Sequence, residues 1–291
     1  MLRYNSSNST GNLYVIVVAG LAIALFTAIV LWPSGSKSPI NGASVPDTPL
    51  TQALNDPATL NYLAALHRVK PKIADRLQAK AEDAISSGAD NNQLAALVLA
   101  AYGTELEDDY KYLLRADVKH FDKMLRMSQQ GLSTLSSKAP KYCRPAHYLQ
   151  FEHMDPQDVA TEMTRLFEYE TAAYEWALRF NVMTLEAIES GRDNPQKYDR
   201  LTSGDQMALQ NTMMRLMGNP QVTRLMQLQG KSEAEQKRAA MTMNFCGLGV
   251  DLLAAVNGLP ADTKSRLLGE MQHQVKSGDL KRLMRTVQSG I

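Results

Sequence analysis

The sequence has almost no net charge and carries none of the common enzyme motifs. Lysine plus arginine number 31 and aspartate plus glutamate number 30, so the formal net charge is +1. Because nucleic-acid binding depends largely on neutralising phosphates with basic residues, we expect no nucleic-acid partner. The chain lacks G-x-S-x-G, H-E-x-x-H and the dinucleotide-binding glycine motif. These absences favour a non-catalytic protein, and no cofactor is expected.

Strict alternation of polar and apolar residues, which is typical of β-strands, is also missing. Apolar residues instead recur with a period near 3.6, as in the stripe that begins Leu106, Tyr110, Leu113. Helix starts are marked by Asp-Pro pairs, with Asp56 before Pro57 and Asp155 before Pro156, because proline is tolerated at the first helical position. The sequence predicts an all-α fold, an irregular bundle of roughly seven to nine helices.

Charged residues are absent from positions 13–32, which are apolar almost throughout. Twenty helical residues span about 30 Å, the thickness of a membrane's hydrocarbon core. Tyr14 and Trp32 lie at the two ends, where aromatic side chains favour the membrane interface. A cleaved signal peptide is the alternative, but its apolar core is shorter and its cleavage site closer. The run predicts a transmembrane signal-anchor helix through which the chain contacts the membrane.

Composition changes on either side of this run suggest how the chain is organised. Residues 1–12 form a short N-terminal tail, and residues 33–56 contain four prolines without a sustained apolar period. The second stretch predicts a flexible stalk. Residues 57–291 then form a helical globular domain, which the irregular segment 138–155 divides into two possible subdomains.

The only two cysteines, Cys143 and Cys246, lie 103 positions apart in this domain. Such a pair is typical of one structural disulfide in an oxidising compartment, although two free thiols in a cytosolic protein would give the same sequence. Both glycosylation sequons, at Asn5 and Asn8, precede the apolar run and none falls in the domain. We therefore expect a single-pass protein of the bacterial inner membrane whose C-terminal domain lies in the periplasm.

Cys246 lies in a predicted helix from about 233 to 257, between two glycines that lower helix propensity. Gly247 and Gly249 suggest that another backbone approaches this face closely, and a loop carrying Cys143 would supply it. A different interpretation is a metal site, since Cys143, His147 and His153 could bind zinc with Cys246 as a fourth ligand. A disulfide would consume both thiols and exclude that arrangement.

Glu170 falls on the apolar stripe of a helix predicted to start at 156 and to extend as far as 189, between Leu166 and Ala173. A buried carboxylate has a raised pKa and can act as a general acid, so an alternative function is hydrolysis of an envelope polymer. An ion pair with an arginine, or a partly exposed position, explains the same pattern without catalysis.

Methionines are concentrated after residue 200, among them Met213, Met214 and Met217. Their spacing fits core packing, but flexible thioethers also suit an adaptable binding surface, and copper is a third possibility. Taken with the anchor and the missing enzyme motifs, this favours a membrane-anchored helical domain that binds another protein of the cell envelope. The metal-binding module and the polymer hydrolase remain alternatives.

Overall fold

The computed structural model describes residues 46–102, 106–145, 167–227 and 231–277, and every regular element in these ranges is a helix. The all-α prediction is confirmed, with more helices than expected. In chain order they are α2 (Pro49–Ala53), α3 (Pro57–Val69), α4 (Pro71–Ser86), α5 (Asn91–Ala100), α6 (Leu106–Leu113), α7 (Val118–Lys138), the 3-10 helix η1 (Pro140–Cys143), α10 (Ala172–Asp193), α11 (Ser203–Leu216), α12 (Pro220–Gln227), α13 (Glu233–Ala240), α14 (Phe245–Asn257) and α15 (Ala261–Ser277).

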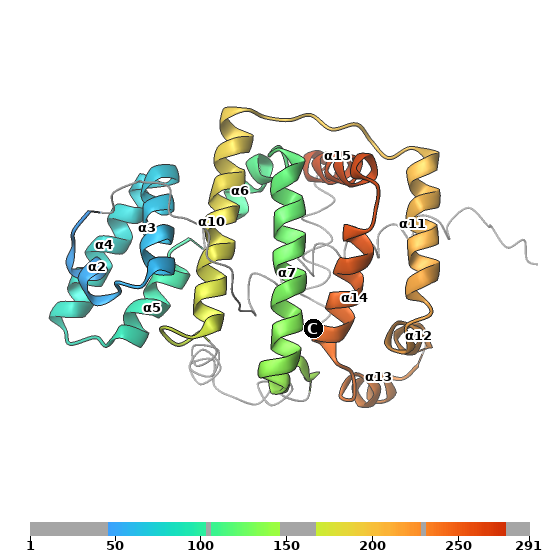
Figure 1. Cartoon of the computed structure of the whole chain (residues 1–291), viewed down its shortest axis with the longest axis horizontal. Coiled ribbons are helices and arrows are strands. Elements are labelled where there is room, and N and C mark those ends of the chain that lie inside the picture. Colours follow the sequence, from blue (N-terminus) through green and yellow to red (C-terminus); the bar gives the residue numbers. More distant parts are fainter. Residues whose placement is uncertain (1–45, 103–105, 146–166, 228–230, 278–291) are drawn as a thin grey trace, which may run out of the picture.

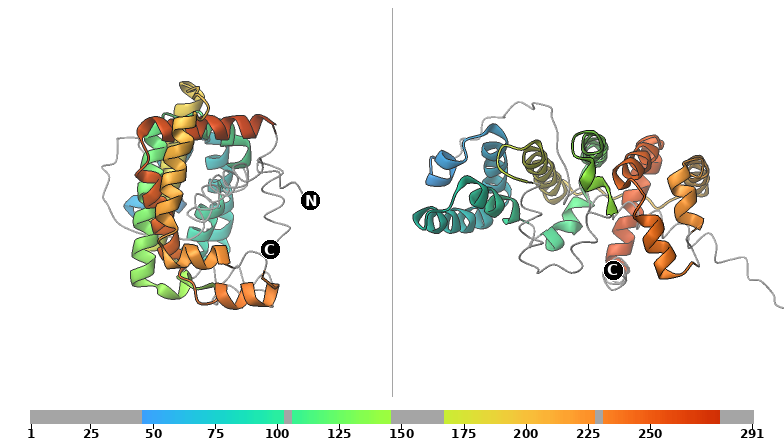
Figure 2. Two further views of the ribbon diagram at one scale, coloured as in Figure 1. Left: turned by 90° about the vertical axis from the view of Figure 1, so that its right-hand side faces the viewer. Right: turned by 90° about the horizontal axis from the view of Figure 1, so that it is seen from below.

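The helices are arranged in succession along the longest axis of the molecule (Figure 1). Helices α2 to α5 form one end, followed by α10, α7 and α14, and α11 forms the opposite edge (Figures 1 and 2). Helix α15 lies across the ends of α7 and α14. The N-terminal group and the α11 edge are therefore at opposite ends of the bundle.

Helix α10 joins the two main parts of the core because two of its faces are buried. Tyr174 and Leu178 pack with the helices of the N-terminal group. Trp176 and Phe180 pack with α7, α14 and α15, and their rings stack with centroids 5.3 Å apart. The Oγ1 of Thr59, on α3, lies 2.7 Å from the Tyr174 hydroxyl oxygen, which adds a buried hydrogen bond across the first interface.

The start of α3 follows the sequence signal. The Asp56 carboxylate accepts the backbone N–H groups of Ala58 and Thr59, both at 3.0 Å, and Pro57 occupies the first helical position. These bonds satisfy two of the amides that a helix start leaves without intrahelical partners.

The predicted stalk is too long at its C-terminal end. Residues 49–53 form α2, capped by Thr48, and Leu50 and Leu54 are buried in the core of the N-terminal group. Two leucines four positions apart are enough to hold this single helical turn against α4, although the stretch is too short for a helical period to stand out.

Residues 13–32, the predicted anchor, lie outside the described residues, as do the tail and most of the stalk. In the four described ranges, no helix combines the length and the apolar character that crossing a membrane requires.

The helix predicted over 233–257 is broken in the structure, because residues 241–244 separate α13 from α14. Cys246 therefore lies in the first turn of α14. Helix α14 packs along α7, and a Cβ added at Gly249 would lie 2.5 Å from Leu132 Cδ1. The expected close approach exists at Gly249, but the neighbour is a side chain of α7 and not the backbone of the Cys143 loop.

Candidate functional site

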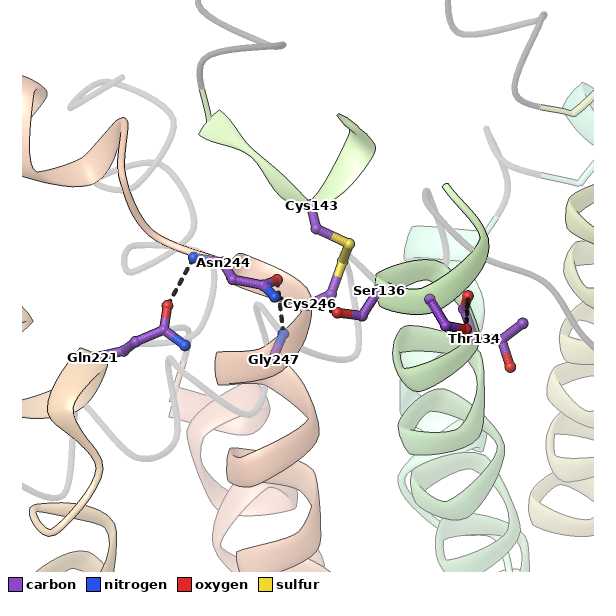
Figure 3. The surroundings of a disulfide bond; sticks show 8 residues. Thr134, Ser136, Cys143, Gln221, Asn244, Cys246 and Gly247 are labelled. Atoms are coloured by element: carbon purple, nitrogen blue, oxygen red, sulfur yellow. Dashed lines mark hydrogen bonds between the residues drawn. A yellow bond between two sulfur atoms is a disulfide. The ribbon is translucent and has the colours of Figure 1, made fainter. Parts of the chain in front are cut away.

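A disulfide joins Cys143 of η1 to Cys246 of α14, with the two Cα atoms 5.1 Å apart (Figure 3). Both cysteines are almost fully buried in the core shared by α7, α10 and α14. The predicted disulfide is confirmed. Because both sulfurs are bonded to each other, neither is available as a thiolate ligand, and the zinc site that used Cys143 is wrong.

Asn244 fixes the N-terminus of α14 beside the disulfide (Figure 3). Its side-chain oxygen accepts the Gly247 N–H at 3.1 Å, and its side-chain Nδ2 donates to Ser136 Oγ on α7 at 3.2 Å. Its backbone N–H donates to Gln221 Oε1 on α12 at 2.7 Å. One capping residue thus connects α14 to both α7 and α12, next to the covalent link.

One face of helix α11 is buried, and this face packs on the outer side of α14. Leu209 and Leu216, seven residues apart, are buried on this face. Leu216 belongs to a small cluster with Val222, Met243 and Leu248, drawn from α12, the α13–α14 connection and α14. This small cluster, which we call the edge cluster, packs the end of α11 against α12 and α14, whereas Leu209 packs in the main core.

The opposite face of α11 carries exposed methionines. Met207 and Met214 are also seven residues apart, so they lie on one face two helical turns from each other. Met207 is 61% exposed, Met214 55%, and Met217 at the helix end 46%. We call these three side chains the methionine stripe. Met213, predicted to belong to this surface, instead packs partly buried against the edge cluster.

The methionine stripe is part of a local excess of exposed apolar side chains. Within the ranges that the structure describes, all the exposed large hydrophobic residues lie between 207 and 245, the other two being Met241, just after α13, and Phe245, the first residue of α14. Single exposed methionines need no explanation, but their concentration on one edge of the bundle is typical of an interaction surface.

The N-terminus of α11 is fixed by a buried carboxylate. Asp205, 4% exposed, accepts hydrogen bonds from Thr202 Oγ1 at 2.6 Å and Thr263 Oγ1 at 2.6 Å. Arg266 Nη1 lies 3.1 and 3.2 Å from its two oxygens. Burial raises the pKa of Asp205, but the hydroxyl and backbone hydrogen bonds and the Arg266 charge outweigh it and lower the pKa to about 2. Helix α15 therefore holds α11 through a charged carboxylate.

Glu170 is exposed and lies in the turn before α10, with a positive φ of 62°. The prediction that it is a buried acid is wrong, because residues 167–171 are not helical and α10 begins at Ala172 after the N-cap Thr171. The helical period used to place Glu170 does not extend through this turn. The polymer-hydrolase alternative thereby loses the carboxylate that motivated it.

His147 and His153 lie outside the described residues. Among the residues that are described, no three histidine, cysteine, aspartate or glutamate side chains gather as a metal-binding group.

Met207 belongs to the methionine stripe but was not singled out from the sequence. Its signal is the seven-residue spacing to Met214, which becomes informative only once the buried face of α11 is known. The chain matches no protein-family model, no curated protein and no solved structure.

Proposed function

We propose that this protein is a non-catalytic component of the cell envelope, anchored in the membrane by residues 13–32, whose helical domain binds another protein through the methionine stripe. The observation that carries the proposal is the outer face of α11, where Met207 and Met214 are exposed opposite the buried Leu209 and Leu216, with Met217 exposed at the end of the helix. A helix with apolar residues on two opposite faces needs a second packing partner to bury both.

The proposed location of the protein is the bacterial inner membrane, with the helical domain in the periplasm. The buried Cys143–Cys246 disulfide supports it, because disulfides persist in oxidising compartments and are rare in the cytosol. The uncharged run 13–32 supports the anchor.

The arrangement of the described helices supports a binding surface outside the membrane. The chain enters the described part at residue 46, beside α2, while α11 forms the other end of the bundle (Figure 1). A partner protein in the periplasm could therefore reach the methionine stripe without entering the membrane.

Site-specific photocrosslinking in living cells tests the binding proposal. A benzophenone amino acid replaces Met214 in the full-length chain, and the control replaces Ala79, an exposed residue of α4 at the opposite end. We expect an adduct with another protein from position 214 and none from position 79. Adding Met207→Gln should weaken the adduct while leaving folding unchanged, because glutamine has a similar helix propensity. Equal adducts at both positions would refute the proposed function.

Thiol labelling tests the proposed location of the domain in the periplasm. An Ala79→Cys variant in cells with a permeabilised outer membrane is treated with a membrane-impermeant maleimide. Labelling before lysis is expected for a periplasmic domain. Labelling only after the inner membrane is opened would place the domain in the cytosol.

A further inference from the structure

Exposed basic side chains outnumber exposed acidic ones in the part of the chain that contains the methionine stripe. Between residues 203 and 245, the exposed charged side chains that the structure describes are Arg215, Arg224, Lys231 and Arg238 on the basic side and Glu235 on the acidic side. The chain as a whole is almost neutral, with 31 basic and 30 acidic residues. The excess of positive charge is therefore a property of this edge and not of the protein.

The acidic side chains that the structure describes on this edge already have partners. Asp205 is buried against Arg266 on the inner face of α11, and its charge is compensated there. The Glu235 carboxylate accepts the Ser232 hydroxyl at 2.7 Å and the Ser232 backbone N–H at 3.1 Å, which makes it a helix cap. Outside this range, the exposed Asp251 of α14 accepts a hydrogen bond from the side-chain amide of Asn219, which follows α11. None of these three carboxylates forms an ion pair with Arg215, which follows Met214 directly in the chain.

We infer that the methionine stripe binds an acidic amphipathic helix of the partner protein, with apolar residues against the methionines and carboxylates against the flanking arginines. This inference rests on the proposed function and names the chemistry of the partner. Methionine side chains adapt to differently shaped apolar residues, and an α-helix can lie along the two turns between Met207 and Met214. The positive charges of the arginines beside the stripe favour an acidic partner and disfavour a basic one.

The test offers the protein two designed helical peptides that differ only in charge. Both have the same leucine face, and the polar face is all glutamate in one and all lysine in the other. The full-length chain, with the photocrosslinking residue at position 214, is reconstituted into uncharged phosphatidylcholine vesicles and given both peptides in equal amounts. Mass spectrometry then identifies what is bonded to position 214: the acidic peptide, the basic peptide, a lipid or a second copy of the chain.

We expect the acidic peptide to exceed the basic one by roughly fivefold or more, since several screened ion pairs each contribute modestly. In an Arg215→Glu and Arg224→Glu double variant the preference should reverse. An Arg215→Gln and Arg224→Gln variant should lose the preference without reversing it, which separates a charge effect from a folding defect. Thermal unfolding of each variant confirms that the domain is folded.

Equal adducts with the two peptides, or adducts mainly with lipid or with a second copy, would overturn the inference. That result leaves the proposed function standing if position 214 still captures a protein in cells. Loss of every protein adduct in cells would instead refute the proposed function itself, so the two failures are distinguishable.

Discussion

Arg266 on α15 donates to both carboxylate oxygens of Asp205 on α11, at 3.1 and 3.2 Å, although the two residues are 61 positions apart. The same carboxylate caps α11 through Thr202, whose backbone N–H it accepts at 2.8 Å. The buried carboxylate of Asp205 therefore caps the start of α11 and also joins α11 to α15. The orientation of the methionine stripe depends on this connection.

The first prediction is that this carboxylate makes stability depend on pH. The pKa of Asp205 is lowered from 3.8 to about 2 by folding, so its contribution is fully present above pH 4 and is lost as the pH falls towards 2. The contribution should be about 2 kcal/mol, since each pKa unit corresponds to about 1.4 kcal/mol. The difference in the free energy of urea unfolding between the wild type and Asp205→Asn should therefore fall by about this amount between pH 7 and pH 2.

The difference between the two proteins should shrink as the pH approaches 2, because a protonated aspartate and an asparagine are then both neutral. The comparison cancels the titration of all other carboxylates. A difference that stays constant from pH 7 to pH 2 would contradict the assigned role of Asp205.

The second prediction concerns the disulfide. A link between residues 103 positions apart restricts the unfolded chain, which contributes up to about 4–5 kcal/mol in the chain-entropy model. Adding a reductant during urea unfolding should therefore lower the midpoint of the wild type strongly. The Cys143→Ala and Cys246→Ala double variant should be insensitive to reductant, and a wild-type midpoint unaffected by it would show that the link does not stabilise the fold.

The third prediction uses two glycines with opposite surroundings. A Cβ added at Gly269 of α15 would lie 2.1 Å from the Asp199 carbonyl oxygen, so Gly269→Ala should displace α15 and destabilise the fold by about 1–3 kcal/mol. At Gly204 the nearest atom is Thr202 Oγ1, at 3.7 Å. Gly204→Ala should therefore be neutral or slightly stabilising, by up to about 1 kcal/mol. Equal unfolding free energies for the two variants would contradict the close packing of α15.

Features that depend on neighbouring residues could be predicted from local sequence signals. The all-α class follows from the apolar period, and the start of α3 follows from Asp56 and Pro57, because a cap and its amides are close in the chain. The disulfide could be inferred because the chain has only two cysteines and hence one possible pairing.

Features that depend on which face of a helix is covered could not be obtained in this way. The apolar period predicts that Glu170 lies on a buried stripe, which the turn at 167–171 interrupts. It also groups Met213 with Met214, although the two point to different sides of α11. The two errors have different causes: a turn replaces the expected helix at Glu170, whereas the covered face of α11 decides the position of Met213. Periodicity shows that a helix has an apolar face, but only the packing of α14 and α12 shows which face of α11 is buried.

The last prediction concerns a buried ammonium group. Lys264 of α15 is 7% exposed, and its Nζ lies 2.8 Å from Asp122 Oδ1 of α7. Asp122→Ala would leave this charge buried without a partner and should cost about 3 kcal/mol. Lys264→Met keeps most of the apolar packing of the side chain, so the double variant should regain part of the loss.

A double-mutant cycle of unfolding free energies measures this coupling, which should exceed about 1 kcal/mol and persist in 1 M salt because burial limits screening. The matched control is Arg68 with Glu189, whose atoms are 3.1 Å apart while the Arg68 side chain is 42% exposed. Coupling in that pair should be about 0.5 kcal/mol or less and should vanish in salt. Equal, salt-sensitive coupling in both pairs would mean that water reaches Lys264. It would then contradict the close packing of α15 against α7 around this ion pair.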